Sequence, residues 1–436
     1  MKRIAAIVAG ALILAASTYG VRTLAASPAR ARVNPVIDLG SPGISDRSEL
    51  ERLISAYEEQ VHGHPNSTAF TFLAKLYLQR ARLTGDLGTY EQARAAVARS
   101  LRMSPKDTEA RTLLATLQYT THDFAAALRT ASSIVAGDQT ALGASAIIAD
   151  AQMELGDYGH ATGIIATLHA KAPHSSAVEV RQARLSFLRG DTATARSLAA
   201  AATRDAKAEG AFGASLAFFH TFEGQLAFDA GRYADAADAY RIALSLAPDW
   251  IVAEYGLARA EASLGDLGAA VSSYERLVAQ QPQPDALGAL GDLYRAMGRT
   301  ALASREYDTV QFIGTLARIN RQVFNRQLVL FDADHGVHVS EALALAENEL
   351  RVRRDVYGYD AYSWILYRAG RYADAAAASQ RALALGTNDA RLWYHAGMIA
   401  IANGDRSTGT TWLRRALALS PSFDLLQAKR AREALS

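Results

Sequence analysis

The stretch that decides the fold runs from Leu226 to Pro248 and reads LAFDAGRYADAADAYRIALSLAP. Gly231 separates two segments whose apolar residues recur at helical spacing, and the small residues Ala236 and Ala243 lie in the second segment. Glycine adopts the left-handed conformation that ends many helices, small residues let two helices approach closely, and proline cannot continue a helix. The stretch therefore predicts two antiparallel helices joined at Gly231, the second ending before Pro248.

The same pattern recurs along most of the chain. Turn positions, nearly all glycine and mostly 33 or 34 residues apart, fall at residues 88, 122, 156, 190, 231, 265, 298, 336, 370 and 404. Small residues follow these turns at Ala127, Ala161, Ala195, Ala236, Ala270, Ala303 and Ala375, and again at Ala202, Ala243 and Ala382. Proline closes a unit at Pro105, Pro173, Pro248, Pro282 and Pro421. Because one helix pair cannot bury its apolar face alone, the grid predicts about ten pairs stacked as a solenoid.

Two units are longer than the grid requires. The 41 residues from Gly190 to Gly231 exceed the usual 34 by seven, and we expect the extra residues near Asp205 to Ala211. Seven residues add two helical turns and return the apolar stripe to nearly the same face. The first helix of the first unit, about Ser67 to Thr84, is likewise expected to run some two turns long.

The repeat resembles the tetratricopeptide repeat, a helix pair of about this length with small residues at these offsets and a closing proline. The copies 226–248 and 393–421 carry the resemblance best, and it covers residues 66–421. His122 in place of the turn glycine, and Gln139 and Thr387 in place of the closing proline, depart from the pattern. The resemblance implies an all-α, right-handed superhelical solenoid, to which residues 48–65 and 422–436 add capping helices.

The first residues are typical of an export signal. Lys2 and Arg3 precede the apolar run Ile4 to Ala16, and small residues follow it. Residues 1–26 are therefore expected to be a signal peptide or an uncleaved membrane anchor, with a buried core helix as the remaining alternative. Residues 27–47, with three prolines and no apolar period, predict a flexible linker. Either form of the leader places the rest of the chain outside the cytoplasm, as a periplasmic, secreted or anchored protein, and the whole pattern resembles exported bacterial tetratricopeptide-repeat proteins.

Composition excludes several function classes. The chain has 436 residues, 50% of them apolar, and no cysteine, which excludes disulfides, thiolate metal sites and a cysteine nucleophile. Without Lys2, Arg3 and Arg22 of the leader, the 46 basic residues fall to 43 against 44 acidic ones. A nucleic-acid-binding protein normally has a basic excess, so we expect no nucleic-acid partner.

Motifs for chemistry are missing from the sequence. There is no dinucleotide-binding or phosphate-binding glycine loop, no HExxH and no GxSxG, so we predict no catalytic residues and no cofactor. The stretch 331–338, FDADHGVH, holds two carboxylates and two imidazoles that could hold a divalent metal. Gly336 falls on the turn grid, however, and Asp and His are ordinary solvated turn residues, which explains this composition better, so no metal site is predicted.

The resemblance implies that the first helix of each pair lines a concave groove. Its groove positions, counted back from each turn, are Tyr119, Arg184, Phe187, Gln225, Phe228, Tyr255, Arg259, Asp292, Arg295, Trp364, Tyr367, Tyr394 and Met398. Aromatic rings and arginines suit peptide anchoring, although the same residues could pack only against neighbouring helices. None of the positions six before a turn is Asn, so the clamp that some relatives use for a chaperone's C-terminal carboxylate is absent.

These features favour a non-enzymatic scaffold outside the cytoplasm that binds a protein or peptide in its groove and helps to assemble an envelope complex. The alternative is an accessory or catalytic solenoid acting on a cell-surface polymer, which would need paired carboxylates facing one cleft. Self-association through the solenoid ends is compatible with the first interpretation, and contact with a membrane is expected only through an uncleaved leader.

Overall fold

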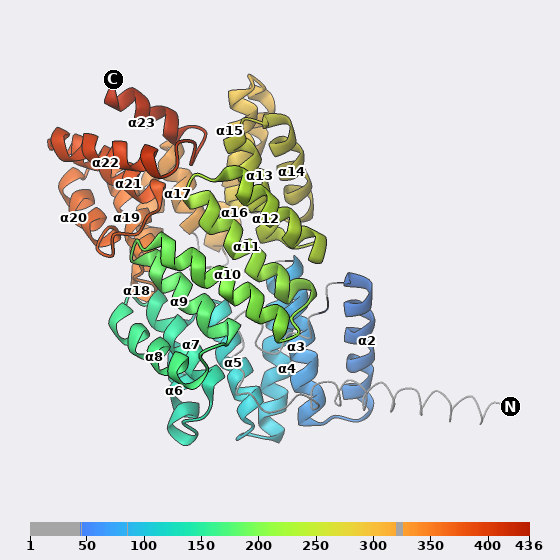
Figure 1. Cartoon of the computed structure of the whole chain (residues 1–436). Coiled ribbons are helices and arrows are strands. Elements are labelled where there is room, and N and C mark those ends of the chain that lie inside the picture. Colours follow the sequence, from blue (N-terminus) through green and yellow to red (C-terminus); the bar gives the residue numbers. More distant parts are fainter. Residues whose placement is uncertain (1–43, 45, 85, 320–325) are drawn as a thin grey trace. The chain divides into compact units, whose positions relative to one another are not determined.

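The computed structural model describes residues 44, 46–84, 86–319 and 326–436, and this part of the chain contains twenty-two helices and no strand (Figure 1). The expected leader and nearly all of the expected linker lie outside the described residues. Among the described helices, none is both long and apolar enough to span a membrane.

Twenty of the helices form ten consecutive pairs, which confirms the all-α fold of helix pairs. The pairs are α3 (Ser67–Thr84) with α4 (Leu87–Met103), α5 (Thr108–Thr120) with α6 (Phe124–Gly137), α7 (Leu142–Glu154) with α8 (Tyr158–Lys171), α9 (Ser176–Leu188) with α10 (Thr192–Ala208), α11 (Gly213–Asp229) with α12 (Tyr233–Leu246), α13 (Ile251–Leu264) with α14 (Leu267–Gln280), α15 (Pro284–Ala296) with α16 (Thr300–Ile319), α17 (Arg326–His335) with α18 (Val339–Val352), α19 (Val356–Arg368) with α20 (Tyr372–Ala382), and α21 (Ala390–Ala402) with α22 (Arg406–Leu419). The helices α2 (Arg47–Gly63) and α23 (Gln427–Leu435) lie at the two ends.

The residues of the repeat grid have the roles that their chemistry suggests. The ten grid alanines are at most 3% exposed, because they lie where paired helices touch. Each of the five closing prolines follows its second helix by two residues. His122, which stands in for a turn glycine, has a left-handed φ of 62°, like the grid glycines from Gly156 to Gly404.

One turn position is wrong. Gly88 lies inside the first turn of α4, which begins at Leu87, and Asp86 caps that helix by accepting from the Gly88 amide at 3.0 Å. The Asp86 side chain fills the place that Asp123 and Asp157 fill in later repeats, so the first turn lies about three residues before the grid position.

The seven extra residues are shared between two helices. The helices α10 and α11 have 17 residues each, whereas α8 has 14 and α9 has 13. The first helix of the first unit, α3, runs from Ser67 to Thr84 as expected.

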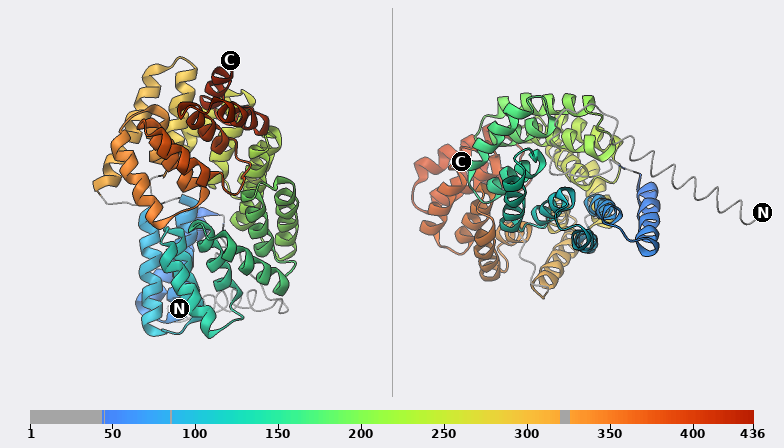
Figure 2. Two further views of the ribbon diagram at one scale, coloured as in Figure 1. Left: turned by 90° about the vertical axis from the view of Figure 1, so that its left-hand side faces the viewer. Right: turned by 90° about the horizontal axis from the view of Figure 1, so that it is seen from below.

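The C-terminal repeats fold back against the middle repeats, which the repeat grid does not reveal (Figures 1 and 2). Three loops of the C-terminal repeats, 353–356, 386–389 and 420–424, pack on the turns that follow α7, α9, α11 and α13, and we call these contacts the closure seam. The Asn388 amide donates to the Gly190 carbonyl at 2.7 Å, and the Ser422 amide donates to the Tyr233 hydroxyl at 2.7 Å. Nearly 200 residues separate each pair, so the seam joins distant repeats side by side.

Candidate functional site

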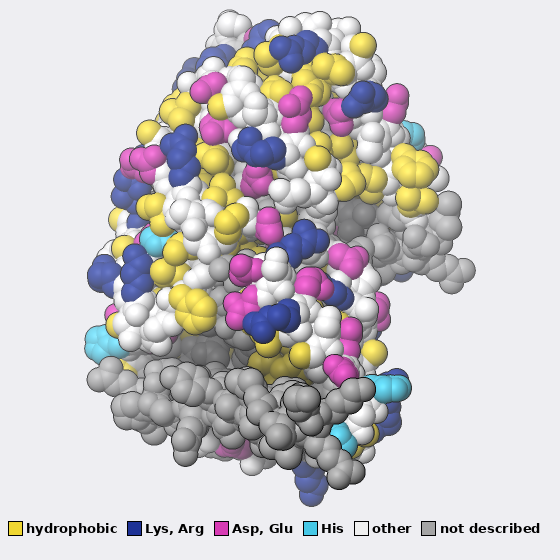
Figure 3. All heavy atoms as spheres, turned by 90° about the vertical axis from the view of Figure 1, so that its right-hand side faces the viewer, with side chains coloured by type: hydrophobic (Ala, Val, Ile, Leu, Met, Phe, Trp, Pro, Cys, Tyr) yellow, Lys and Arg dark blue, Asp and Glu magenta, His cyan; other side chains and the backbone are white. Residues whose placement is uncertain are grey.

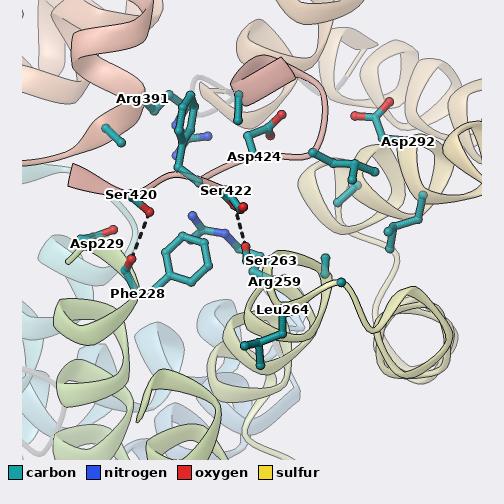
Figure 4. A pocket seen from close by; sticks show the side chains of 18 of the residues that line it. Phe228, Asp229, Arg259, Ser263, Leu264, Asp292, Arg391, Ser420, Ser422 and Asp424 are labelled. Carbon is teal, nitrogen blue, oxygen red and sulfur yellow. Dashed lines mark hydrogen bonds between the residues drawn. The ribbon is translucent and has the colours of Figure 1, made fainter. Parts of the chain in front are cut away.

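A cavity of about 470 Å³ opens at one end of the closure seam (Figure 4). Its walls come from α11, α13, α14 and α15 on one side, and from the start of α21, the loop 420–425 and α23 on the other. Four of the thirteen predicted groove residues line it: Phe228, Tyr255, Arg259 and Asp292. Both sides are tied together, because the Ser263 hydroxyl donates to the Ser422 carbonyl at 2.7 Å.

The other nine predicted groove residues lie elsewhere. Trp364, Tyr394 and Phe187 are buried between helices, and Trp364 stacks on Tyr367 and on His395. Tyr119 and Arg184 contact the buried Glu154, whereas Gln225 donates from its amide to Asp229 at the cavity edge. Met398 is half-buried and Arg295 is exposed. Burial of Trp364 and Tyr394 corresponds to the packing alternative, while the binding role of all thirteen residues stays a prediction.

Each carboxylate that lines the cavity already has protein donors. Asp229 accepts twice from the Gln225 amide, at 2.8 and 2.9 Å, and Asp292 accepts from the Tyr307 hydroxyl at 2.7 Å. Asp389 accepts from the Arg391 backbone amide, and Asp424 accepts from two backbone amides at the start of α23. These carboxylates therefore hold the walls in place.

Three arginines line the cavity, and Arg432 donates to the Pro421 backbone carbonyl, whereas Arg259 and Arg391 have no hydrogen-bonded carboxylate among the described residues. Arg259 lies over the Phe228 ring, with 4.1 Å between the guanidinium carbon and the ring centroid. No carboxylate oxygen of a described residue lies within 4.0 Å of the guanidinium nitrogens of Arg259 or Arg391. Arg259 enters from α13 and Arg391 from α21, on opposite sides of the cavity (Figure 4).

Burial changes the charge balance of the cavity. Burial first, and then the negative charge of Asp389, raise the pKa of Asp229 to about 7, so this carboxyl is about half protonated at neutral pH. Burial also raises the pKa of Asp424. For Arg259, burial and the positive charge of Arg391 act to lower the pKa, although the net shift is upward. Burial also acts to lower the pKa of Arg391, but the nearby negative charge of Asp389 raises it. An anionic group between the two guanidinium groups would relieve the repulsion that Arg391 exerts on Arg259.

The stretch 331–338 does not form one metal centre, because its side chains make separate contacts. Asp334 accepts from the Trp364 indole at 2.8 Å, and His335 bonds to Asp292 at 3.0 Å. His338 lies 3.7 Å from the buried Asp332.

Sequence reasoning missed Arg391, Asp389 and Asp424, which lie at the starts of helices rather than at the four groove offsets. Asp389 and Asp424 are each the single charged residue just before α21 and α23, a pattern that an ordinary helix cap also produces. Only the closure seam, which no repeat period encodes, brings these residues opposite α13.

Comparison with known proteins supports the repeat. The sequence profile of the family described as "Tetratricopeptide repeat" matches residues 78–141, 223–283, 255–311 and 363–422, so the chain contains tetratricopeptide repeats. No curated protein sequence matches it significantly.

Solved structures of similar fold include a tetratricopeptide repeat protein from Parabacteroides merdae ATCC 43184, at 18% identity over 60% of this chain and 97% of that one, with a TM-score of 0.32. Yeast Tom70 is similar at 10% identity over 92% of this chain and 95% of its own, with a TM-score of 0.37. The human IFIT1 dimer with m7Gppp-AAAA is similar at 15% identity over 77% of each chain, with a TM-score of 0.48.

Proposed function

We propose that this chain of tetratricopeptide repeats is a non-enzymatic scaffold outside the cytoplasm, which holds a partner protein by a carboxylate-bearing peptide segment and helps to assemble an envelope complex. One observation carries the proposal: Arg259 and Arg391 line the cavity without a carboxylate of a described residue in ion-pair distance, while the carboxylates of the cavity are engaged. A ligand carboxylate between Arg259 and Arg391 would relieve their repulsion and form charge-assisted hydrogen bonds with both.

The size and lining of the cavity suit a short segment. Ligand pockets commonly measure about 300–1,000 Å³, so about 470 Å³ admits a few side chains and not a folded domain. The rings of Phe228, Tyr255 and Phe423 supply apolar contact area beside the two arginines. A protruding tail or loop of a partner therefore fits best.

The surface charge supports a polypeptide partner. On the face in Figure 3, basic and acidic side chains are interspersed and neither sign forms a continuous patch. That distribution agrees with the nearly balanced charge of the chain without its leader, whereas nucleic-acid binding would be favoured by a basic stripe.

The partner can be identified by crosslinking from the cavity. A photo-crosslinking amino acid at Tyr255 should capture a specific partner in intact cells, whereas one at the exposed Tyr372 of α20 should not. Equal capture of the partner from both positions would show that the partner does not bind specifically in the cavity.

The captured segment, made as a peptide, then tests the arginines. Arg259→Ala and Arg391→Ala should each weaken binding about tenfold or more, because each removes a hydrogen bond to a charged group. Arg196→Ala is the control, since Arg196 of α10 is exposed, lies outside the cavity and is not a predicted groove residue. An amidated C-terminus and Asp or Glu changed to Asn or Gln distinguish a terminal from a side-chain carboxylate.

Export requires its own test. A reporter enzyme that is active only outside the cytoplasm, fused after Ser436, should be active, and Leu12→Arg with Leu14→Arg should abolish that activity. Each arginine in the apolar run costs roughly 3 kcal/mol on membrane-insertion scales. Activity of a cytoplasm-specific reporter in the unmutated fusion would contradict export.

The alternative, a solenoid that acts on a cell-surface polymer, is supported by one observation. Asp229, with its pKa raised to about 7, and Asp389 line the same cavity, and a carboxyl whose pKa lies near neutral pH can act as a general acid. Release of soluble fragments from isolated cell-wall polymer by the wild type, and not by Asp229→Asn, would favour this alternative over the scaffold.

A further inference from the structure

Away from the cavity, His174, Glu179 and Asp205 converge at the edge of the pair α9–α10. Their ligand atoms all lie within 4.8 Å of one another, and the imidazole Nδ1 lies 4.0 Å from an Asp205 oxygen. We propose that these three side chains bind one divalent first-row transition-metal ion. The proposal does not depend on the proposed function of the cavity.

A comparison with a later repeat shows what is unusual here. Glu179 and Glu254 both lie eleven residues before the turn glycine of their repeat, and both are buried. Glu254 is paired with Arg276 of the second helix, at 2.9 Å. Glu179 faces another acid, Asp205, where its counterpart faces a cation.

The carboxyl group of Glu179 lacks the donors that a buried acid needs. The residue is 7% exposed, and its Oε2 atom is buried without a hydrogen-bond partner. Burial, and then the neighbouring Asp205, raise the pKa of Glu179 to about 7. Two adjacent carboxylates repel each other, so a cation bound between them would stabilise their ionised forms.

The extra residues of this unit hold Asp205 in place. Regular second helices end at the position that corresponds to Asp205, as α8 does at Lys171 and α12 does at Leu246. The longer α10 continues to Ala208, so that Asp205 lies within a helical turn. Just beyond, Glu209 accepts from the Ser176 amide at 3.0 Å and so fixes the start of α9, which carries Glu179.

The donor set indicates the kind of ion. One imidazole nitrogen and two carboxylate oxygens suit Zn²⁺, Mn²⁺ or Co²⁺, whereas Mg²⁺ and Ca²⁺ prefer oxygen ligands only. His174 is exposed, so water can complete the coordination from the solvent side.

Calorimetric titration of the untagged full chain with ZnCl₂ and with MnCl₂, after treatment with a chelator, tests the proposal. We expect saturation at one ion per chain, with binding weakened at least tenfold in Glu179→Gln and in Asp205→Asn and also weakened in His174→Ala. The control is Asp157→Asn, which removes an exposed carboxylate 2.6 Å from His160 but no buried acid, and it should bind as the wild type does.

The pH dependence distinguishes the metal from a shared proton. Metal binding competes with protonation of imidazole and carboxylate ligands, so binding should be tighter at pH 8 than at pH 6, with proton release on titration. Circular dichroism should show the same helix content in all variants. Absence of saturable binding at pH 8, or equal binding by the wild type and Glu179→Gln, would overturn the proposal and leave a pair that shares a proton.

Discussion

The two ends of the closure seam contain the same kinds of charged residue and balance them differently. At one end, Glu154 of α7 pairs with Arg184 and with Arg353, and Arg326 pairs with Glu349 and Asp355 at 2.6 and 2.7 Å. Each of these arginines has a carboxylate partner. At the other end, Arg259 and Arg391 line the cavity without one.

This difference suggests different roles for the two ends of the closure seam. Removing one partner from a buried ion pair leaves an uncompensated charge, so a complete network fixes how two surfaces dock. Unmatched charges weaken the fold and are expected where a ligand supplies the missing partner. The Glu154 end therefore holds the C-terminal repeats in place, whereas the cavity end is where we propose that a ligand binds.

The largest effect is expected at the Glu154 end. Glu154→Ala should destabilise the chain by about 3 kcal/mol, because two arginines lose their counter-charge at a buried position. Urea unfolding followed by circular dichroism measures the loss. Glu51→Ala, which breaks an exposed pair with Arg80 at 3.0 Å, should cost less than about 1 kcal/mol.

Acid should reproduce this effect without a mutation. The pKa of Glu154 is lowered to about 2, because burial, which would raise it, is outweighed by Arg184 and Arg353. A carboxyl with a lowered pKa stabilises the fold above its unfolded value of 4.5, and this contribution is lost as the pH falls through about 2. Equal acid sensitivity of the wild type and Glu154→Ala would count against a stabilising role for this charge.

A pair of glycines tests the backbone of the seam. Gly190 and Gly370 have the same left-handed conformation, with φ of 76° and 74°. A Cβ at Gly190 would lie 2.4 Å from the Gly386 carbonyl oxygen across the seam, whereas one at Gly370 would meet nothing within 4 Å. Gly370→Ala should therefore cost about 1 kcal/mol of conformational strain, and Gly190→Ala about 2–3 kcal/mol because the loop must also move. Equal losses of unfolding free energy in the two variants would show that the loop at Gly386 can move away from a Cβ at residue 190 without destabilising the closure seam.

The sequence predicted the repeats well because their determinants are local. The turn glycines, the grid alanines and the closing prolines act within one helix pair, so their spacing encodes the ten pairs. The closure seam depends on contacts such as Asn388 to Gly190, between residues that no period relates. Repeat stacking predicts nearest neighbours and carries no information on which distant repeats meet.

Only part of the candidate site was predicted, because the repeat pattern places residues on first helices but does not show which distant repeats meet. Phe228, Tyr255, Arg259 and Asp292 lie on first helices at the expected offsets, and they line the cavity. Arg391 belongs to the other side of the seam, so it could not be identified without the fold. Trp364 and Tyr394 were predicted to line the groove or to pack between helices, and both are buried. The sequence did not distinguish these alternatives, because an aromatic residue at a groove offset also suits the core of a closely packed repeat.

A smaller effect, with a defined sign, is expected at Asp229. Its pKa is raised from 3.8 to about 7, so between these values the folded state holds a proton that the unfolded chain has lost. Stability from this carboxyl is therefore lost as the pH rises through about 7. Asp229→Asn should raise the melting temperature by about 1–3 °C at pH 8 and hardly at all at pH 5. A rise of equal size at both pH values would contradict ionisation as the cause.

The smallest effect on stability is expected for a substitution of Arg391, at the cavity end of the closure seam. Arg391→Met removes a charge that repels Arg259 but is attracted by nearby Asp389, and it keeps much of the side-chain volume. These two effects oppose each other, so the free energy of unfolding should change by less than about 1 kcal/mol in either direction. Arg353→Met, at the other end of the seam, should instead cost about 2 kcal/mol or more, because it leaves buried Glu154 with one partner fewer. Denaturant unfolding of the two variants side by side measures the contrast. Equal losses of unfolding free energy would mean that Arg391 stabilises the fold as Arg353 does. The difference between the two ends of the closure seam would then no longer support ligand binding in the cavity.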